Sequence, residues 1–282
     1  MKNNKTGSLA WQQRHPGAHI CLALWSLLVL FPLWVMVVNS FKDRLSIYEN
    51  PFWLPTSWNF KNYTDILHNS SFINYFKNSF IIVVVSLTLV LVFGALASYA
   101  FASWRGKLPR VLFLCMIAGM MLPIKIASIR LLEMMRALHL LNTIVSLIPI
   151  YVAMGIPIAI FVLTSFIREL PIELTEAALV DGAGRFYIFR AIIVPLIRPA
   201  LATVAIYNLV PFWNDLWFPL IFITDEKAKT LLLGVTRLFG QYQTDWSKVL
   251  AVLTLSAIPV IALYLAMSKQ FIAGLTAGAV KG

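Results

Sequence analysis

An all-α membrane protein with several transmembrane helices is the fold class that this sequence predicts, and three observations predict it. Of its 282 residues, 60% are hydrophobic and only 12% are charged, whereas a soluble domain carries about 25% charged residues. The mean hydropathy is +0.80. The apolar residues gather in long runs, and a helix needs about 20 of them to cross the hydrocarbon core of a bilayer. These observations exclude an ordinary cytosolic enzyme and a disordered chain.

Six apolar runs predict six transmembrane helices. Four runs contain no Asp, Glu, Lys or Arg for 20 residues or more, a fifth contains only Asp215, and the third, Val111–Ile124, is short. The first run is too long for the apolar core of a signal peptide, so we expect a retained anchor. We expect a single domain, residues 1–282, with spans at about 20–41, 76–103, 111–129, 140–167, 199–223 and 249–268.

Basic residues in the loops indicate the orientation. Residues 105–110 hold three bases, and short basic loops mark the cytoplasmic side. We therefore expect both termini in the cytoplasm, with a folded outer segment at 42–77 and an amphipathic helix lying flat at 125–136. This topology places twelve Lys and Arg with four acids inside, and eleven with seven acids outside. Because the bases are spread over both faces, the net charge of +11 does not indicate nucleic-acid binding.

The sequence lacks the motifs of bond chemistry. It contains no GxxxxGK[ST] phosphate loop, no HExxH metal motif and no GxSxG nucleophile motif. Cys21 and Cys115 lie in apolar runs without metal-binding spacing, so they predict neither a disulfide framework nor a zinc site. We expect a protein that is not an enzyme and binds no metal or cofactor. Transport, anchoring and signalling remain as its possible roles.

The longest cytoplasmic segment, residues 168–198, predicts a short helix on the inner surface. Pro171 suits the first position of a helix, and Glu173 lies near the positive end of the helix dipole. Gly182 stands where a helix can end with a residue at positive φ. The segment therefore predicts a helix, a glycine turn and a return to the membrane.

This segment has the composition of a docking surface. Ala177 and Ala178 would let the groove of another protein approach closely, and Glu176 and Asp181 would offer carboxylates to its basic residues. The alternative is a helix that lies on lipid headgroups. Its four acids oppose that alternative, because anionic lipids repel them.

The same residues resemble a motif of a known family. The segment Glu176-Ala177-Ala178, Gly182 after three further residues and, nine residues later, Ile192-Ile193-Val194-Pro195 resemble the EAA loop of ATP-binding cassette (ABC) importer permeases. Only Val194 departs from that pattern, which has leucine there. Trp213-Asn214-Asp215 and residues 274–282 are similar to the carbohydrate-uptake branch, in particular to its MalG-like subunits. The family-like core covers residues about 74–270.

The resemblance implies a type I ABC-importer permease fold with a cytoplasmic coupling helix, in the inner membrane of a bacterium. It implies four kinds of partner: a homologous second permease subunit, two ATP-binding subunits that carry ATP and Mg²⁺, an extracytoplasmic sugar-binding protein and membrane lipid. The EAA loop would be held in a groove of the ATPase. The coupling residues that it implies are Glu176, Ala177, Ala178, Leu179, Asp181, Gly182, Ala183 and Pro195.

Polar residues in the fifth span form a candidate translocation path. A charge at mid-bilayer costs about 2.5–3.5 kcal/mol, so we expect Asp215 to face protein or water. Asn208 lies two helical turns earlier on the same face. In one interpretation Asn208, Asn214 and Asp215 hydrogen-bond a sugar while Trp213 stacks on it. In the other, Asp215 packs helices and the tryptophan belongs to an aromatic belt.

The residues together with this resemblance imply the permease subunit of an ATP-driven, binding-protein-dependent sugar importer. One alternative is an importer of another small solute, such as a polyol or glycerol phosphate. An alternative of a different class is a secondary transporter or a membrane scaffold without a transport role.

Overall fold

The computed structural model describes residues 16–68, 70–104, 106–239 and 244–279, and in these ranges the regular structure is helical apart from one isolated bridge between Phe239 and Thr244. The chain, which we expected to form one domain, divides into two compact units. The first unit contains residues 1–68 and 238–255, and the second contains residues 69–237 and 256–282. Two elements contribute to both units: η5 (Thr236–Leu238) and the long helix α15 (Trp246–Ala279).

In the first unit, a network of buried polar groups follows the first long helix. The Asn62 amide donates hydrogen bonds to the carbonyls of Ser40 and Lys42, both at 3.1 Å. The Lys42 side chain is 1% exposed, and its Nζ donates to Asn39 Oδ1 at 2.9 Å and to the Asn50 carbonyl. Burial lowers the pKa of Lys42, because desolvation disfavours the ammonium form. The helices before residue 69 are α2 (Pro16–Ser40), α3 (Arg44–Glu49) and α4 (Lys61–His68).

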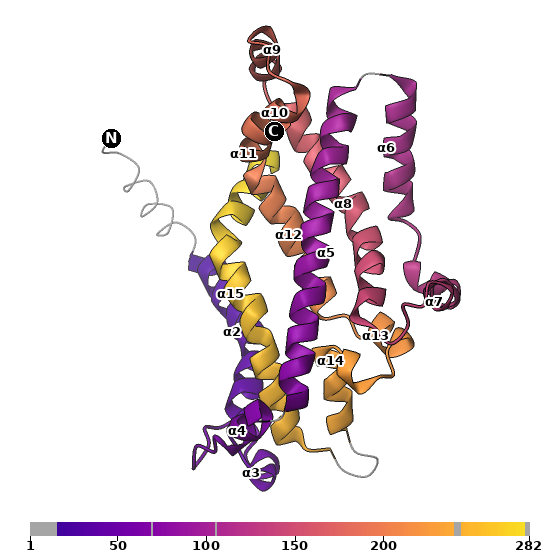
Figure 1. Ribbon diagram of the computed structural model, residues 1–282. Helices are drawn as coiled ribbons and strands as arrows, with labels where there is room; N and C mark the ends of the chain where they lie inside the picture. The colour runs from indigo at the N-terminus through magenta and orange to yellow at the C-terminus, as the bar shows by residue number, and fades with distance from the viewer. Residues whose placement is uncertain (1–15, 69, 105, 240–243, 280–282) are drawn as a thin grey trace. The chain divides into compact units, whose positions relative to one another are not determined.

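In the second unit, α5 (Ser70–Ser103) and α8 (Leu147–Glu169) lie side by side along much of their length (Figure 1). Small residues allow their close contact, since a Cβ built on Gly94 would lie 2.6 Å from the Cβ of Ala159. Ser98 Oγ donates to the Ile160 carbonyl at 3.4 Å. Helix α12 (Arg198–Trp213) packs against both. These three helices form the core that positions the loops at its ends.

Four helices are each long and apolar enough to cross a membrane: Pro16–Ser40, Ser71–Ser103, Ile144–Glu169 and Trp246–Lys269. Two bent pairs, if each is one span, bring the number to six among the described residues: Lys107–Gly119 with Ile124–Ala137 at 82°, and Arg185–Leu196 with Arg198–Trp213 at 73°. The expected third span, 111–129, crosses the first of these bends. Helix α7 (Ser128–Ala137), in the expected amphipathic segment, therefore turns sharply away from α6 (Lys107–Gly119).

The expected fifth span, 199–223, is interrupted. Helix α12 ends at Trp213, and a separate helix, α13 (Trp217–Phe222), begins after three intervening residues. Pro211 and Pro219 supply no backbone N–H for a continuous helix. The Asp215 carboxylate accepts hydrogen bonds from the backbone amides of α13 and so starts the new helix.

Short elements pack against the N-terminal part of α5. Asn78 Nδ2 donates to the carbonyls of Lys227 and Lys229, at 2.8 and 2.9 Å, and Ser79 Oγ accepts the Leu231 N–H at 2.8 Å. These bonds fix the chain after α13 against α5. The short elements of this unit, apart from the α9–α11 segment, are η1 (Ile124–Ala127), η2 (Ile144–Ser146), η4 (Glu226–Ala228) and α14 (Leu231–Val235).

Candidate functional site

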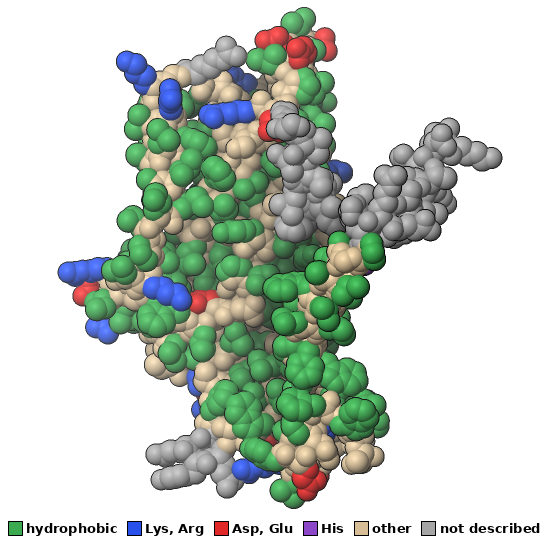
Figure 2. All heavy atoms as spheres, turned by 180° about the vertical axis from the view of Figure 1, so that it is seen from behind, with side chains coloured by type: hydrophobic (Ala, Val, Ile, Leu, Met, Phe, Trp, Pro, Cys, Tyr) green, Lys and Arg blue, Asp and Glu red, His purple; other side chains and the backbone are tan. Residues whose placement is uncertain are grey.

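Helix α9 (Glu173–Val180) projects from one end of the second unit (Figure 1). Its apolar side chains are uncovered: Leu174 and Leu179 are exposed, and Val180 is 88% exposed. Figure 2 shows acidic side chains beside hydrophobic ones at this end. An isolated helix of eight residues is marginal in water. A protein surface that covers these side chains would therefore stabilise it.

The chain around α9 carries local signals for a short helix. Glu173 and Glu176 lie in its first turn, where negative charge favours the helix dipole. At its end the Gly182 N–H bonds to the Leu179 carbonyl at 3.0 Å, and the Ala183 N–H bonds to the Ala178 carbonyl at 2.9 Å. Gly182 adopts φ +81°, as the sequence predicts. This Schellman arrangement satisfies carbonyls that would otherwise lack partners.

The return to the core is made by α10 (Arg185–Ile188), the π-helical segment η3 (Phe189–Ile193) and α11 (Val194–Leu196). Ile188 and Ile193 are buried, so this segment is anchored while α9 stays outside. Pro195 lies in the first turn of α11, where its missing N–H is not needed. Of the predicted loop residues, Ala178 and Ala183 are half-buried, and Glu176, Ala177, Leu179, Asp181, Gly182 and Pro195 are exposed.

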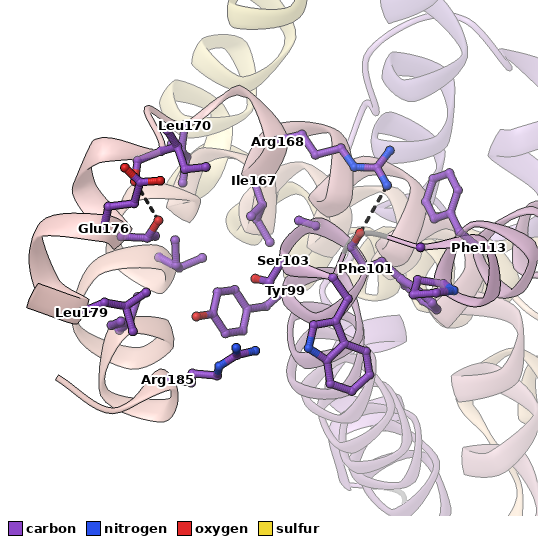
Figure 3. A pocket seen from close by; sticks show the side chains of 18 of the residues that line it. Tyr99, Phe101, Ser103, Phe113, Ile167, Arg168, Leu170, Glu176, Leu179 and Arg185 are labelled. Carbon is purple, nitrogen blue, oxygen red and sulfur yellow. Dashed lines mark hydrogen bonds between the residues drawn. The ribbon is translucent and has the colours of Figure 1, made fainter. Parts of the chain in front are cut away.

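A pocket of about 820 Å³ lies behind α9, between the ends of α5, α6 and α8 (Figure 3). Arg168 stands on one side beside Phe113, whereas Glu176 and Leu179 stand on the α9 side. The Arg168 guanidinium donates to the Phe101 carbonyl at 3.2 Å and lies 5.3 Å from the centre of the Phe113 ring. This pocket joins the α5–α6 connection to the α9 segment.

The candidate path residues are not gathered on one open surface. Asn208 is 4% exposed, and its Nδ2 donates to the Val204 carbonyl at 2.8 Å. Its Oδ1 faces Gly155, where an added Cβ would approach it to 2.9 Å. Asn208 therefore lies in the contact between α8 and α12.

The side chains of Trp213 and Asn214 lie in different environments. The Trp213 side chain is buried, its Nε1 donates to the Ser256 carbonyl at 3.0 Å, and its ring meets the edge of Phe76. Asn214 is exposed, and its Nδ2 donates to the Val210 carbonyl at 3.0 Å. In this conformation the tryptophan ring has no open face for stacking.

Asp215 binds groups of the protein itself. Its Oδ2 accepts the Tyr151 hydroxyl at 2.9 Å and the Phe218 N–H at 3.3 Å. Its Oδ1 accepts the Trp217 N–H at 3.0 Å. The carboxylate thus caps α13 and ties it to α8. This geometry agrees with the interpretation of Asp215 as a helix-packing aspartate.

The sequence does not predict two of the side chains that the structure places at these sites. Tyr151 lies 64 residues before Asp215, and no local pattern links them. Arg168 follows the fourth span, but neither the neighbouring ring nor the carbonyl that holds it is close in sequence. Among the residues that the structure describes, no three His, Cys, Asp or Glu side chains gather as a metal site requires.

Comparison with known proteins identifies relatives along nearly the whole chain. Residues 90–276 match the family described as "Binding-protein-dependent transport system inner membrane component". A putative ABC transporter permease protein, ORF2, of Caldicellulosiruptor is 36% identical over 93% of this chain and 96% of its own length. The diacetylchitobiose uptake system permease protein NgcG of Streptomyces coelicolor is 34% identical over 93% of this chain and 87% of its own. A bacterial ABC transporter that imports the polysaccharide alginate contains a chain of similar fold, with a TM-score of 0.78 at 20% identity over 96% of this chain and 98% of its own.

Proposed function

The chain belongs to the family of binding-protein-dependent transport system inner membrane components, and on this premise we propose that it forms one half of a sugar-translocation path with a second, homologous permease. Family membership favours an ATP-driven importer over the alternatives of a secondary transporter or a scaffold. ATP hydrolysis would occur on two partner ATPase subunits, which would hold ATP and Mg²⁺. An extracytoplasmic binding protein would deliver the solute.

The exposed helix α9 is the observation that carries this proposal. It offers uncovered apolar side chains and exposed Ala177 beside acids, and its end is fixed by the turn at Gly182. Such a surface fits a groove with basic residues at its rim. We assign α9 as the coupling helix, which would transmit ATPase closure to the core through α10, η3 and α11.

The positions of charged loops support the proposed orientation. Gly106 and Arg110, from the basic α5–α6 connection, line the same pocket as Thr175 and Glu176 of α9. Both predicted cytoplasmic segments therefore lie at one end of the second unit (Figure 1). Placing this end at the inner surface would put the ATPase there, and the six-span topology expected from the sequence would then put both termini in the cytoplasm as well.

The proposed substrate is a sugar or oligosaccharide. NgcG, a relative similar over most of both chains, is named for the uptake of diacetylchitobiose. A polyol or glycerol phosphate is the alternative. Binding measured on the partner extracytoplasmic protein, across sugars and phosphorylated polyols, distinguishes these substrates. Tight binding of the polyols alone would contradict a sugar importer.

The coupling role is tested by changing Ala177→Glu in the importer reconstituted into vesicles. A bulky charge at this exposed alanine should block seating in the ATPase groove, so sugar import is lost while ATP hydrolysis continues. Lys107→Glu is the control, because Lys107 is also exposed at this end but belongs to the start of α6, outside the segment from α9 to α11. Import at the normal rate and normal ATP cost in Ala177→Glu would overturn the coupling assignment. Sugar flux through this chain without any ATPase would overturn the ATP-driven importer.

A further inference from the structure

We propose that the pocket behind α9 binds the headgroup of an anionic phospholipid. Its volume of about 820 Å³ lies in the range of small-molecule sites. Arg110, Arg168 and Arg185 line it together with a single acid, Glu176. The lining is therefore net basic and suits a phosphate diester.

The arginines of this pocket keep donors for an anion. Among the described residues, no carboxylate lies within ion-pair distance of any of the three. Arg168 is held by the Phe101 carbonyl and the Phe113 ring. The hydrogen bond to the carbonyl uses one of the five N–H donors of the guanidinium. An arginine positioned in this way can bind two phosphate oxygens at once. Glu176 stands on the α9 side of the pocket and Arg168 on the opposite side (Figure 3).

The position of the pocket points to a lipid as the source of that phosphate. The pocket lies where α5 and α8 end, which is the headgroup level for helices that span a bilayer. Trp104 on its rim is 61% exposed, and tryptophans favour this level of a membrane. Leu114 of α6 lines the pocket and is 55% exposed. An acyl chain could leave the pocket along the exposed apolar side of α6, which a soluble phosphate could not use.

This binding stands independently of the coupling role proposed above. The lipid would contact both the α5–α6 connection and Arg185 of α10, and would thereby link the membrane helices to the segment that carries α9. Basic pockets at the ends of transmembrane helices are known to hold anionic headgroups.

The test measures lipid binding to the delipidated full-length chain by native mass spectrometry, with dioleoyl phosphatidylglycerol or dioleoyl phosphatidylcholine added. We expect at least one phosphatidylglycerol to bind about tenfold more tightly than phosphatidylcholine. Arg185→Gln and Arg168→Gln should each weaken this binding about tenfold, because each removes a charge-assisted contact. Arg190→Gln is the matched control, since Arg190 is exposed in neighbouring η3 but does not line the pocket.

Arg168→Gln also removes two contacts within the protein, so Arg185→Gln carries the test if Arg168→Gln fails to fold. Equal binding of the two lipids, or an unchanged preference in Arg185→Gln, would overturn the proposal. Displacement of phosphatidylglycerol by millimolar inorganic phosphate would reassign the pocket to a soluble anion. If the ATPase subunits protect Arg185 from chemical modification equally well with and without lipid, the pocket would be reassigned to a protein partner. Loss of coupling in Ala177→Glu with lipid binding intact would separate this proposal from the coupling role.

Discussion

Replacing Asp215 distinguishes a helix-packing carboxylate from one that binds the transported solute. Its oxygens accept the Tyr151 hydroxyl at 2.9 Å and the N–H groups of Trp217 and Phe218 at 3.0 and 3.3 Å. Asp215→Ala removes every one of these acceptors. Asp215→Asn keeps one side-chain oxygen and a similar shape, while it removes the charge.

The magnitude for Asp215→Ala follows from these contacts. Loss of a helix cap lowers the free energy of unfolding by about 1 kcal/mol. The Tyr151 side chain is 2% exposed, and a buried hydroxyl left without its partner costs about 1–3 kcal/mol more. We therefore expect Asp215→Ala to lose about 2–4 kcal/mol. Asp215→Asn should lose about 1 kcal/mol, because the oxygen can still accept one of the bonds.

The assay combines reversible unfolding of the full-length chain in detergent with sugar import by the reconstituted complex. Tyr151→Phe is the partner variant, since it removes the hydroxyl but keeps the ring stacked on Phe212. If the two groups act through one hydrogen bond, the double variant costs less than the sum of the single ones by about 0.5–3 kcal/mol. Asp215→Asn should then import at close to the normal rate.

Two results would refute this reasoning. If Asp215→Ala has the same free energy of unfolding as the unchanged chain, the carboxylate does not hold α13 to α8. Asp215→Asn that folds normally but imports no better than Asp215→Ala would show that the charge acts on the solute.

Three further predictions concern packing, a turn and pH. Gly94→Ala should lower the free energy of unfolding by about 1–3 kcal/mol, because the new Cβ would lie 2.6 Å from Ala159 Cβ, whereas ordinary contacts begin near 3.4 Å. Unfolding in detergent measures this loss. If adding Ala159→Gly does not restore stability, the explanation by close packing is contradicted. Gly182→Ala should cost about 1–2 kcal/mol at φ +81° and increase amide hydrogen exchange of α9; unchanged exchange would contradict it. Burial alone would raise the pKa of Asp245, but hydrogen bonds, led by that from Ser247 Oγ, lower it below 3.8. Its contribution to stability is therefore present above pH 3.8 and is lost as the pH falls through the lower, folded-state pKa; a carboxyl titration by NMR checks this, and Ser247→Ala should move the pKa back upwards.

Local sequence determined the features that depend on neighbours in the chain. Runs of apolar residues predicted the long helices, because the number of apolar residues in a helix determines whether it is long enough to cross a bilayer. Pro171, Glu173 and Gly182 predicted a short helix with a turn at positive φ, since capping and φ preferences act within a few residues. The exposed α9 could be recognised from its own residues.

Contacts between distant segments were decided only by the tertiary structure. Asp215 stands out in the sequence as a charge in an apolar run, but its partner Tyr151 lies 64 residues away, and a hydrogen bond across that separation leaves no periodic signal. The interruption of the fifth span depends on the same carboxylate, because it caps a new helix instead of facing a continuous one. The arginine-lined pocket joins the ends of α5, α6 and α8 to α10. Hydropathy and spacing describe one segment at a time, whereas a pocket exists only once packed helices bring several segment ends together.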